Sequence, residues 1–322
     1  MKNIYIILIL ILSFTIFSCA KKSDSSSSSS TTTTSVKFLA VGASGTLLTS
    51  SDGTTWTSRT SGTTNDLRSV AYDGSSTIVA VGFSGTILTS SDGITWTSRT
   101  SGTSNDINNV TYKDAFVAVG DNGTLLVSTD GITWTDQTSG CGMTEDMWDV
   151  HLTGSIGVII GDNGSIYSST DKGSSCTKRT SGTTVEFNEL LYGDSTFVAA
   201  GDNGTILTSS NGTSWTSRSS STTNNLYGGV YTDSDTDGDK NFILVGASGK
   251  VLTSNSTYTS WTPIDLSSIS TGNLFGIARG STNWVIVGAS GYISSIADSE
   301  SDVTTRTSGT TQSLRRVFYN DE

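Results

Sequence analysis

Short apolar runs that each end in a glycine recur along the chain. The final glycines of these runs lie 38 to 45 residues apart, at Gly42, Gly82, Gly120, Gly161, Gly201, Gly246 and Gly288. A second glycine follows each of them after three residues and predicts the positive φ of a tight hairpin turn. Every repeat therefore contains an apolar strand, a tight turn and a second strand.

Two further strands complete each repeat. One follows an Asp-Gly turn and opens with a tryptophan in most repeats, at Trp56, Trp96, Trp134, Trp215 and Trp261. The other has the pattern Leu67-x-x-Val70-x-Tyr72 in the second repeat, and in the sixth we expect it to begin at Tyr227. Four strands in about 40 residues is the period of a β-propeller blade. The uninterrupted apolar run is typical of a strand buried on both faces between neighbouring blades.

The repeated region covers residues 36–322, and its two ends are complementary. It opens with an apolar strand at Val36 to Gly42 and closes with an unpaired strand at Leu314 to Tyr319. Pairing of these two strands would complete the first blade and leave no free sheet edge. The sequence thus predicts an all-β fold, a closed seven-bladed β-propeller of four-stranded blades.

Residues 1–18 have the features of a secretory signal peptide. Lys2 precedes the apolar run Ile4 to Phe17, which is too short to span a bilayer comfortably. The run leads into Ile16-Phe17-Ser18-Cys19, which resembles a bacterial lipobox. The resemblance implies cleavage before Cys19 and acylation of this cysteine, which would anchor the protein in a membrane. A signal peptide with an incidental cysteine is the alternative.

Residues 19–35 make up the lipidated cysteine and a Ser/Thr-rich segment, for which we expect a flexible, solvated tether. The location that follows is the bacterial cell envelope, at the outer membrane or cell surface rather than the inner membrane. Composition excludes other classes. With 29 acidic against 18 basic residues the net charge is −11, which argues against nucleic-acid binding. One histidine and three cysteines leave little material for a His/Cys metal centre.

The Asp-Gly turn resembles the Asp-box of bacterial neuraminidase repeats. Ser50, Asp52, Gly53 and Trp56 follow its order at a spacing one residue shorter than usual, and the fourth repeat has Cys176 in place of the tryptophan. In such a turn the aspartate accepts backbone N–H groups and the tryptophan packs beneath it, so the motif is structural. Residues 36–322 are similar to propellers of photosystem II assembly factors and of the sialidase superfamily. That similarity indicates the fold rather than the activity.

A sialidase-like enzyme needs converging arginines, a Tyr/Glu nucleophile pair and an acid. The Arg-Ile-Pro opening of that family is absent. His151 replaces the usual Ala or Thr of its strand, and we interpret it as a hydrogen-bonded core residue rather than a base. Five arginines stand three residues after the tryptophan position, at equivalent places around the ring that cannot converge on one substrate: Arg59, Arg99, Arg179, Arg218 and Arg306.

An insertion in the sixth repeat has the ligand spacing of a calcium loop. Carboxylates stand at positions 1, 3 and 5, Gly238 at position 6 and an oxygen donor at position 9. Position 12 is Leu244 instead of the EF-hand glutamate, and the segment resembles the calcium hairpins of FG-GAP propellers. A solvated acidic loop is the alternative to a Ca²⁺ site. The candidate Ca²⁺ ligands are Asp233, Asp235, Asp237, Asp239 and Asn241.

Seven carboxylates are expected on one sector of one face, around the mouth of the channel. In an up-and-down blade the residue before the Leu67-type strand lies on the same face as the turn after the apolar strand. A surface that keeps the protein soluble is one interpretation, and a binding face for a basic partner is the other. The residues are Asp66, Asp106, Asp146, Glu186, Asp121, Asp162 and Asp202.

Cys141 and Cys176 are the two cysteines that lipidation leaves, in an export compartment where a disulfide could form. Cys141 lies in an enlarged loop after the third tryptophan strand, and Cys176 begins the last strand of the fourth repeat. The strand directions place the two at opposite ends of their blades. The sequence therefore leaves this bond open.

The sequence favours a lipid-anchored, non-enzymatic binding or scaffolding module. A sialidase-like carbohydrate-active enzyme and an assembly factor for a membrane complex are the alternatives, and both come from family resemblance. We expect a monomer that contacts the membrane through its lipid anchor and has a protein or glycan partner, whose identity the fold cannot give.

Overall fold

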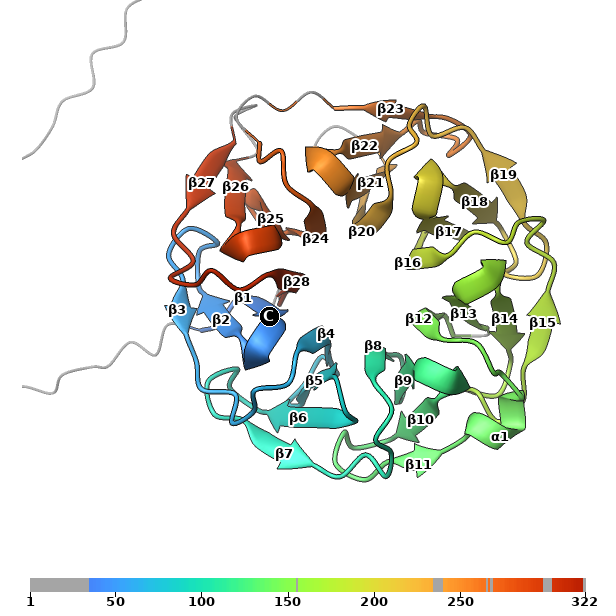
Figure 1. The fold of residues 1–322 in the computed structure, drawn as a ribbon, viewed down its shortest axis with the longest axis horizontal. Helices are drawn as coiled ribbons and strands as arrows, with labels where there is room; N and C mark the ends of the chain where they lie inside the picture. Colours follow the sequence, from blue (N-terminus) through green and yellow to red (C-terminus); the bar gives the residue numbers. More distant parts are fainter. Residues whose placement is uncertain are drawn as a thin grey trace, which may run out of the picture. The chain divides into compact units, whose positions relative to one another are not determined.

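The computed structural model describes residues 35–154, 156–233, 240–264, 266, 269–297 and 303–320. These residues form seven four-stranded antiparallel sheets, arranged as blades around a central axis (Figure 1). The predicted seven-bladed, all-β propeller is confirmed. Within the described ranges no helix has the length and apolar character needed to cross a membrane.

Each blade consists of an innermost, a second, a third and an outermost strand. In blades 1 to 7 the innermost strands are β28 (Leu314–Tyr319), β4 (Leu67–Tyr72), β8 (Ile107–Tyr112), β12 (Met147–Leu152), β16 (Phe187–Gly193), β20 (Leu226–Asp233) and β24 (Leu274–Arg279). The second strands are β1 (Phe38–Gly42), β5 (Ile78–Gly82), β9 (Phe116–Gly120), β13 (Gly157–Gly161), β17 (Thr196–Gly201), β21 (Lys240–Gly246) and β25 (Asn283–Gly288). The third strands are β2 (Leu47–Ser50), β6 (Thr86–Ser90), β10 (Leu125–Ser128), β14 (Ile166–Ser169), β18 (Ile206–Ser209), β22 (Val251–Ser254) and β26 (Ile293–Ala297). The outermost strands are β3 (Thr57–Ser58), β7 (Thr97–Arg99), β11 (Thr135–Asp136), β15 (Thr177–Arg179), β19 (Thr216–Arg218), β23 (Trp261–Pro263) and β27 (Thr304–Arg306).

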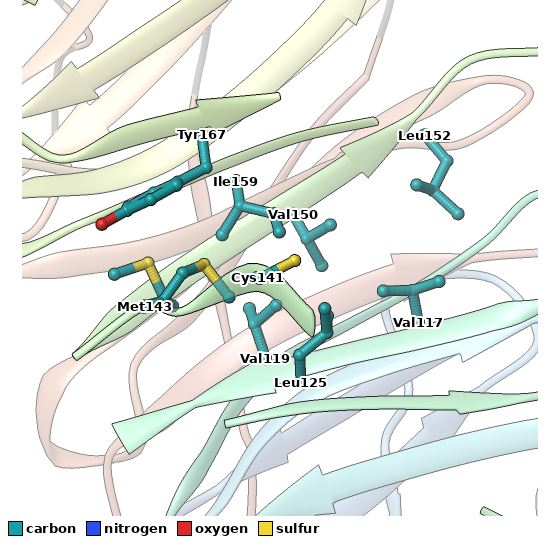
Figure 2. Packing of buried hydrophobic residues seen from close by; sticks show 10 residues of the cluster. Val117, Val119, Leu125, Cys141, Met143, Val150, Leu152, Ile159 and Tyr167 are labelled. Atoms are coloured by element: carbon teal, nitrogen blue, oxygen red, sulfur yellow. The ribbon is translucent and has the colours of Figure 1, made fainter. Parts of the chain in front are cut away.

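The apolar second strands are buried on both faces, as predicted. All five residues of β9 are buried, for example. Among the described residues, seven clusters of buried side chains lie one at each junction between neighbouring blades. Figure 2 shows the junction of blades 3 and 4, where Val119 and Leu125 lie opposite Val150 and Ile159. The hydrophobic core is therefore a ring of interfaces between blades instead of one central cluster.

The two recurring glycines of each repeat have different roles. The first ends the second strand beside the start of the innermost strand, so that a Cβ on Gly82 would lie 2.0 Å from the carbonyl oxygen of Asp66. The second, Gly85, has a φ of +69°, in the left-handed region that favours glycine. The turn between the second and third strands thus requires both glycines, and the predicted positive φ is confirmed.

The chain closes the ring as predicted. The C-terminal strand β28 pairs antiparallel with β1, with Phe38 opposite Tyr319 and Ala40 opposite Val317. Leu314 and Val317 are buried in the cluster between blades 7 and 1. Blade 1 is therefore built from both ends of the folded region and has four strands like the other blades, with the inner edge of β1 paired with β28.

The predicted start of the innermost strand in blade 6 is wrong by one residue. The strand begins at Leu226, which pairs with Gly246 in the register that Leu67 and Gly82 have in blade 2. Leu226 is fully buried and Tyr227 only partly so. Because alternate residues of a strand face opposite sides, this shift by one directs Tyr227 to the channel instead of the core.

The Asp-Gly turns have the hydrogen bonds expected of their sequence. Asp52 Oδ1 accepts the N–H groups of Thr54 and Thr55, both at 2.8 Å. Partial burial opposes ionisation of Asp52, but these donors outweigh it and hold its pKa below the usual range. Trp56 Nε1 donates to the Gly53 carbonyl, so the tryptophan closes the same turn.

The five arginines after the tryptophan position are tied to their own blades. Arg59 Nε–H donates to Thr49 Oγ1 at 2.8 Å, which joins the outermost strand of blade 1 to its third strand. The other four make the same bond to a hydroxyl of their third strand: Arg99 to Thr89, Arg179 to Ser168, Arg218 to Thr208 and Arg306 to Ser295. One arginine per blade cannot converge with the others, as the sequence predicted.

A disulfide joins Cys141 to Cys176, with a Cα–Cα distance of 4.5 Å. The inference that these residues lie at opposite ends of their blades is wrong. The outermost strands run along the rim of the ring, and the short helix α1 (Thr138–Cys141) lies between β11 and β15 (Figure 1). The end of one outermost strand therefore meets the start of the next. A salt bridge joins Lys178 of β15 to Glu145, in the segment that connects blade 3 to blade 4.

Candidate functional site

The innermost strands line a channel that contains two cavities. We call the face that carries the turns between the second and third strands the turn face. A cavity of 370 Å³ on this side, the turn-side cavity, is lined by the second residues of the innermost strands together with Glu189 and Arg316. Each innermost strand has a register shift between its first and third residues, which moves the second residue out of the regular ladder. The second residues are Arg68, Asn108, Trp148, Asn188, Tyr227, Phe275 and Arg315.

A buried charge cluster lies midway along the channel. Arg316 of β28 donates from Nη1 to Glu189 Oε2 of β16 at 2.5 Å, across the ring. Asp149 of β12 accepts the backbone N–H groups of Val150 and Leu190, at 2.7 and 2.8 Å. Glu189 is 1 % exposed and Asp149 is 2 % exposed. The third residues of blades 6 and 7 are glycines, so these blades place no side chain in this part of the channel.

The two carboxyl groups share one guanidinium group. Burial raises the pKa of Glu189 to about 8, while the Arg316 charge opposes this shift. Burial likewise raises the pKa of Asp149 to about 6 against the same opposing charge. With both carboxyl groups ionised the cluster has a net negative charge, so the pair tends to retain a proton and titrates as a unit.

Two guanidinium groups line the turn-side cavity and stack on aromatic rings. Arg68 lies 4.5 Å above the ring centre of Phe83 and 5.3 Å above that of Trp148. Arg315, on the neighbouring innermost strand, lies 4.9 Å above Phe275. Burial, and next the charge of Arg315, lower the pKa of Arg68, against the opposing effect of nearby aspartates. The Nε atoms of both arginines are buried, and neither has a hydrogen-bond partner among the described residues.

The remaining wall of this cavity provides acceptors. Glu186 precedes β16, and Glu189 lies within that strand. Within the described part of the chain Glu189 Oε1 and Asn108 Oδ1 are buried and accept no hydrogen bond. Asn108 is held in this orientation because its Nδ2 donates to Asp121 and to the Met147 carbonyl. Donors therefore gather on blades 1 and 2, and acceptors on blades 3 and 5.

The seven carboxylates predicted for one face lie at their expected places on the turn face, and we call them the acidic sector. Three of them accept a backbone N–H from the turn of the preceding blade: Asp66 from Ser44, Asp106 from Ser84 and Asp146 from Asn122. Three others accept from a second residue of an innermost strand: Asp121 from Asn108, Asp162 from Trp148 and Asp202 from Asn188. Three of the seven carboxylates thus join neighbouring blades, and three others form hydrogen bonds within their own blade.

Several carboxylates of the acidic sector lie near enough to one another to interact electrostatically. Burial raises the pKa of Glu186, and the charges of Asp162, Asp202 and Asp146 raise it further. Burial also raises the pKa of Asp121; its hydrogen bond from Asn108 opposes this, and the charge of Asp146 adds to it. Glu186 has the place of Asp66 and Asp146 in its blade, but it makes no hydrogen bond to the neighbouring turn in the described structure.

The cavity on the opposite side of the charge cluster has a volume of 460 Å³. His151 lines it, 5.7 Å from the ring of Tyr192. Burial, and then the charge of Arg316, lower the pKa of His151 to about 4. The interpretation of His151 as a hydrogen-bonded core residue is wrong, because it faces the channel and no described residue hydrogen-bonds its ring. A collar of large polar side chains completes the wall: Tyr72, Tyr112, Tyr192, Tyr231, Arg279 and Tyr319.

Two predicted sites fall on residues that the structure does not describe. Cys19 lies before residue 35, and Asp235, Asp237 and Asp239 lie between 233 and 240. Asp233 and Asn241 are described and flank this segment on β20 and β21. Among the described residues no group of three or more His, Cys, Asp or Glu side chains could hold a metal ion. The lipidation and calcium predictions therefore remain predictions.

The charged residues of the channel were not predicted from the sequence. Arg68, Arg315, Arg316, Asp149 and Glu189 stand at the second or third position of a strand whose first and fourth positions are apolar. A charged residue beside the bulge of an innermost strand was the available signal. It identifies which side chains face the channel but cannot tell which of them meet, since that depends on the order of the blades around the ring.

No protein-family profile and no curated protein matches this chain. Solved structures with a similar fold include YCF48 bound to D1 peptide, with a TM-score of 0.61 and 18 % identity over 75 % of this chain and 80 % of that one. YCF48 from Cyanidioschyzon merolae has a TM-score of 0.57 and 16 % identity, over 78 % and 85 % of the two chains. The WD40 propeller domain of Doa1 has a TM-score of 0.57 and 14 % identity, over 78 % and 86 %. The chain is thus a seven-bladed β-propeller similar in fold to YCF48.

Proposed function

We propose that this chain is a non-enzymatic binding module whose turn face docks a partner protein. The acidic sector is the observation that carries the proposal, because its carboxylates gather on one side of the channel mouth, where burial and then the charges of neighbouring carboxylates raise the pKa of Glu186 and of Asp121. Clustered like charges destabilise a protein mildly, and a basic partner would relieve that repulsion. A propeller of similar fold, YCF48, has been solved with a bound peptide, which supports a protein partner.

The partner class that this surface fits is a segment rich in Lys and Arg. The test uses a triple variant of the full chain, Asp66→Asn, Asp106→Asn and Asp146→Asn. Asparagine already has this role in blades 6 and 7, where Asn225 accepts from Asn203 and Asn273 accepts from Ser248. We therefore expect the fold to be retained while three charges are lost.

Cross-linking in intact cells should capture a basic partner with the wild type and much less of it with this variant. A matched control carries Asp52→Asn, Asp92→Asn and Asp130→Asn, which remove three charges from the Asp-Gly turns. Asn211 already closes the same turn in blade 5. Equal capture by the wild type and the acidic-sector variant would refute docking at this face. Pull-down from native membranes would show whether the partner belongs to a membrane complex, as the assembly-factor alternative requires.

Sialidase-like catalysis has less support. The five equivalent arginines are bonded to hydroxyl groups of their own blades, and the described structure does not bring them together. A glycan screen with a hydrolysis readout tests this alternative. Sugar release by purified protein would contradict a purely binding role.

We further propose that Cys19 carries the lipid anchor in the cell envelope, on the lipobox resemblance of residues 16–19. The Cys19→Ala variant should accumulate as an unprocessed precursor or be released as soluble protein. Normal partitioning of that variant into the detergent phase would refute lipidation.

Calcium binding by the blade 6 insertion is proposed from ligand spacing alone. Without a bidentate glutamate at position 12, the affinity should be near the ~10⁻⁴–10⁻³ M of extracellular modules. Saturating Ca²⁺ should raise the melting temperature of the wild type but not that of Asp235→Ala. If calorimetry at millimolar Ca²⁺ detects no heat of binding and the melting temperature does not change, the insertion is an acidic loop without a Ca²⁺ site.

A further inference from the structure

The turn-side cavity contains two guanidinium groups that have no hydrogen-bond acceptor in the part of the chain that the structure describes. Arg68 and Arg315 contact aromatic rings, and among the described residues neither makes a hydrogen bond or an ion pair. Burying a charged donor without an acceptor is costly, whereas a guanidinium binds a carboxylate through two parallel hydrogen bonds. Two such groups on neighbouring strands therefore form a site for a carboxylate.

The opposite wall of the cavity carries carboxyl groups, which complement the guanidinium groups. Glu186 and Glu189 belong to blade 5, which lies across the ring from blades 1 and 2 (Figure 1). Glu189 Oε1 is buried without a donor in the described structure, and Glu186 makes no hydrogen bond there through its carboxylate. An ammonium group could pair with Glu186, while Glu189 Oε1 offers a hydrogen-bond acceptor at the floor of the cavity.

The space between these walls suits a small molecule. The cavity volume of 370 Å³ lies within the ~300–1,000 Å³ of typical ligand pockets. Trp148, Tyr227 and Phe275 provide aromatic surface between the charged walls. A ligand with charged ends and an apolar body matches this arrangement.

We propose that the turn-side cavity binds a small zwitterion of the size of a di- or tripeptide. Its carboxylate lies at Arg68 and Arg315, and its ammonium group lies at Glu186. The site shares Glu186 with the acidic sector, but its test measures binding of a small peptide and the docking test measures capture of a basic protein by a variant that keeps Glu186, so either proposal can fail without the other.

The first test is calorimetry of the full-length wild type with trialanine and two blocked forms. N-acetyl-trialanine lacks the ammonium group, and trialanine amide lacks the carboxylate. We expect trialanine to bind and each blocked form to bind at least tenfold more weakly. Absence of binding by trialanine at 10 mM would overturn the proposal. Equal binding of the acetylated peptide would overturn the role of the acidic wall.

The second test assigns each end of the ligand to its wall. Arg68→Gln and Arg315→Gln should each bind trialanine and its amide with similar affinity, because the carboxylate contact is lost. Glu186→Gln should bind trialanine and the acetylated peptide with similar affinity. Arg279→Gln is the matched control, since Arg279 lines only the other cavity and stacks on Trp284. This orientation would be refuted if the three cavity variants still preferred trialanine to its blocked forms as the wild type does. It would also be refuted if Arg279→Gln lost as much affinity for trialanine as they do.

Discussion

At the scale of single residues, the charge cluster in the channel dominates the electrostatics. Arg316 forms one ion pair with Glu189, and Asp149 lies near enough to share its charge. A buried ion pair contributes little net stability because desolvation offsets the attraction, but removing one partner leaves an uncompensated charge. The cluster should therefore respond to pH and to any change that alters its charge balance.

The first prediction concerns pH. Burial raises the pKa of Glu189 to about 8, so the folded protein binds this proton more tightly than the unfolded chain does. Protonated Glu189 therefore adds to the free energy of unfolding below the ordinary glutamate pKa, and this contribution is lost as the pH rises toward 8. Each unit of difference in pKa corresponds to about 1.4 kcal/mol. Glu189→Gln should flatten the fall in melting temperature between pH 5 and about 9.

Glu145→Gln is the control for this prediction. Partial burial opposes ionisation of Glu145, but its contact with Lys178 outweighs that effect and lowers its pKa to about 2. Glu145 therefore stabilises the folded protein above its ordinary pKa, and this stabilisation is lost when the pH falls toward 2. This variant should keep the wild-type slope above pH 5. An unchanged slope in Glu189→Gln would show that Glu189 does not retain its proton.

The second prediction concerns Arg316. Arg316→Met leaves two buried carboxyl groups without a counter-charge and should cost about 3–5 kcal/mol in the free energy of unfolding near pH 8. At pH 5 the carboxyl groups are protonated to a greater extent, so the loss should be smaller. Adding Glu189→Gln and Asp149→Asn should restore much of the stability. Denaturant unfolding at both pH values measures this, and an equal loss at pH 5 and 8 would contradict the mechanism.

At the scale of secondary-structure elements, neighbouring blades are joined by recurring polar contacts as well as by apolar packing. The carboxylate or amide before an innermost strand accepts an N–H from the turn of the preceding blade, as Asp106 does from Ser84. The junction of blades 3 and 4 adds the Cys141–Cys176 disulfide and the ion pair of Lys178 with Glu145. That junction is reinforced covalently where blade 4 has lost the tryptophan of the repeat.

The third prediction concerns this disulfide. The bond joins cysteines that are 35 residues apart, and closing a loop of that length stabilises a protein by about 2–4 kcal/mol. Cys141→Ser combined with Cys176→Ser should lower the melting temperature of the wild type. Reductant should lower the melting temperature of the wild type to the same extent and leave that of the variant unchanged. Titration of free thiols in unfolded wild type without reductant should detect neither cysteine, and detection of both would contradict the bond.

At the scale of the whole molecule, stability depends on closure of the ring. The clusters at the blade junctions form a continuous circle only because β28 from the C-terminus completes the blade that β1 begins. The same strand carries Arg315 and Arg316, so closure also builds the channel. A failure to close would therefore remove both a junction and the site.

The fourth prediction tests closure. A chain that ends before Ser313 loses the burial of Leu314 and Val317, each worth about 1.5–3 kcal/mol, and exposes the edge of β1. We expect a large loss in melting temperature together with aggregation. Leu314→Ala gives a milder test, with an expected cost of about 2–5 kcal/mol. A truncated protein that melts like the full chain would disprove closure by β28.

The sequence alone determined the repeat, the number of blades, the order of strands and the pairing of the two ends. Each of these depends on a local pattern of apolar runs and glycines that recurs along the chain. It also located the acidic sector, because equivalent positions in a repeat occupy equivalent places on the ring. Blade 6 is the exception, since Tyr227 and Leu226 are both apolar enough to open a strand and only the register separates them.

Tertiary structure alone decided which side chains meet. Glu189 and Arg316 are 127 residues apart in the chain and come together because their blades face each other across the channel. The Cys141–Cys176 bond depends on the course of the outermost strands along the rim, which no local pattern encodes. The repeat therefore specifies the position of a residue within its blade. Distances between residues of different blades are set by how the sheets pack and twist around the ring.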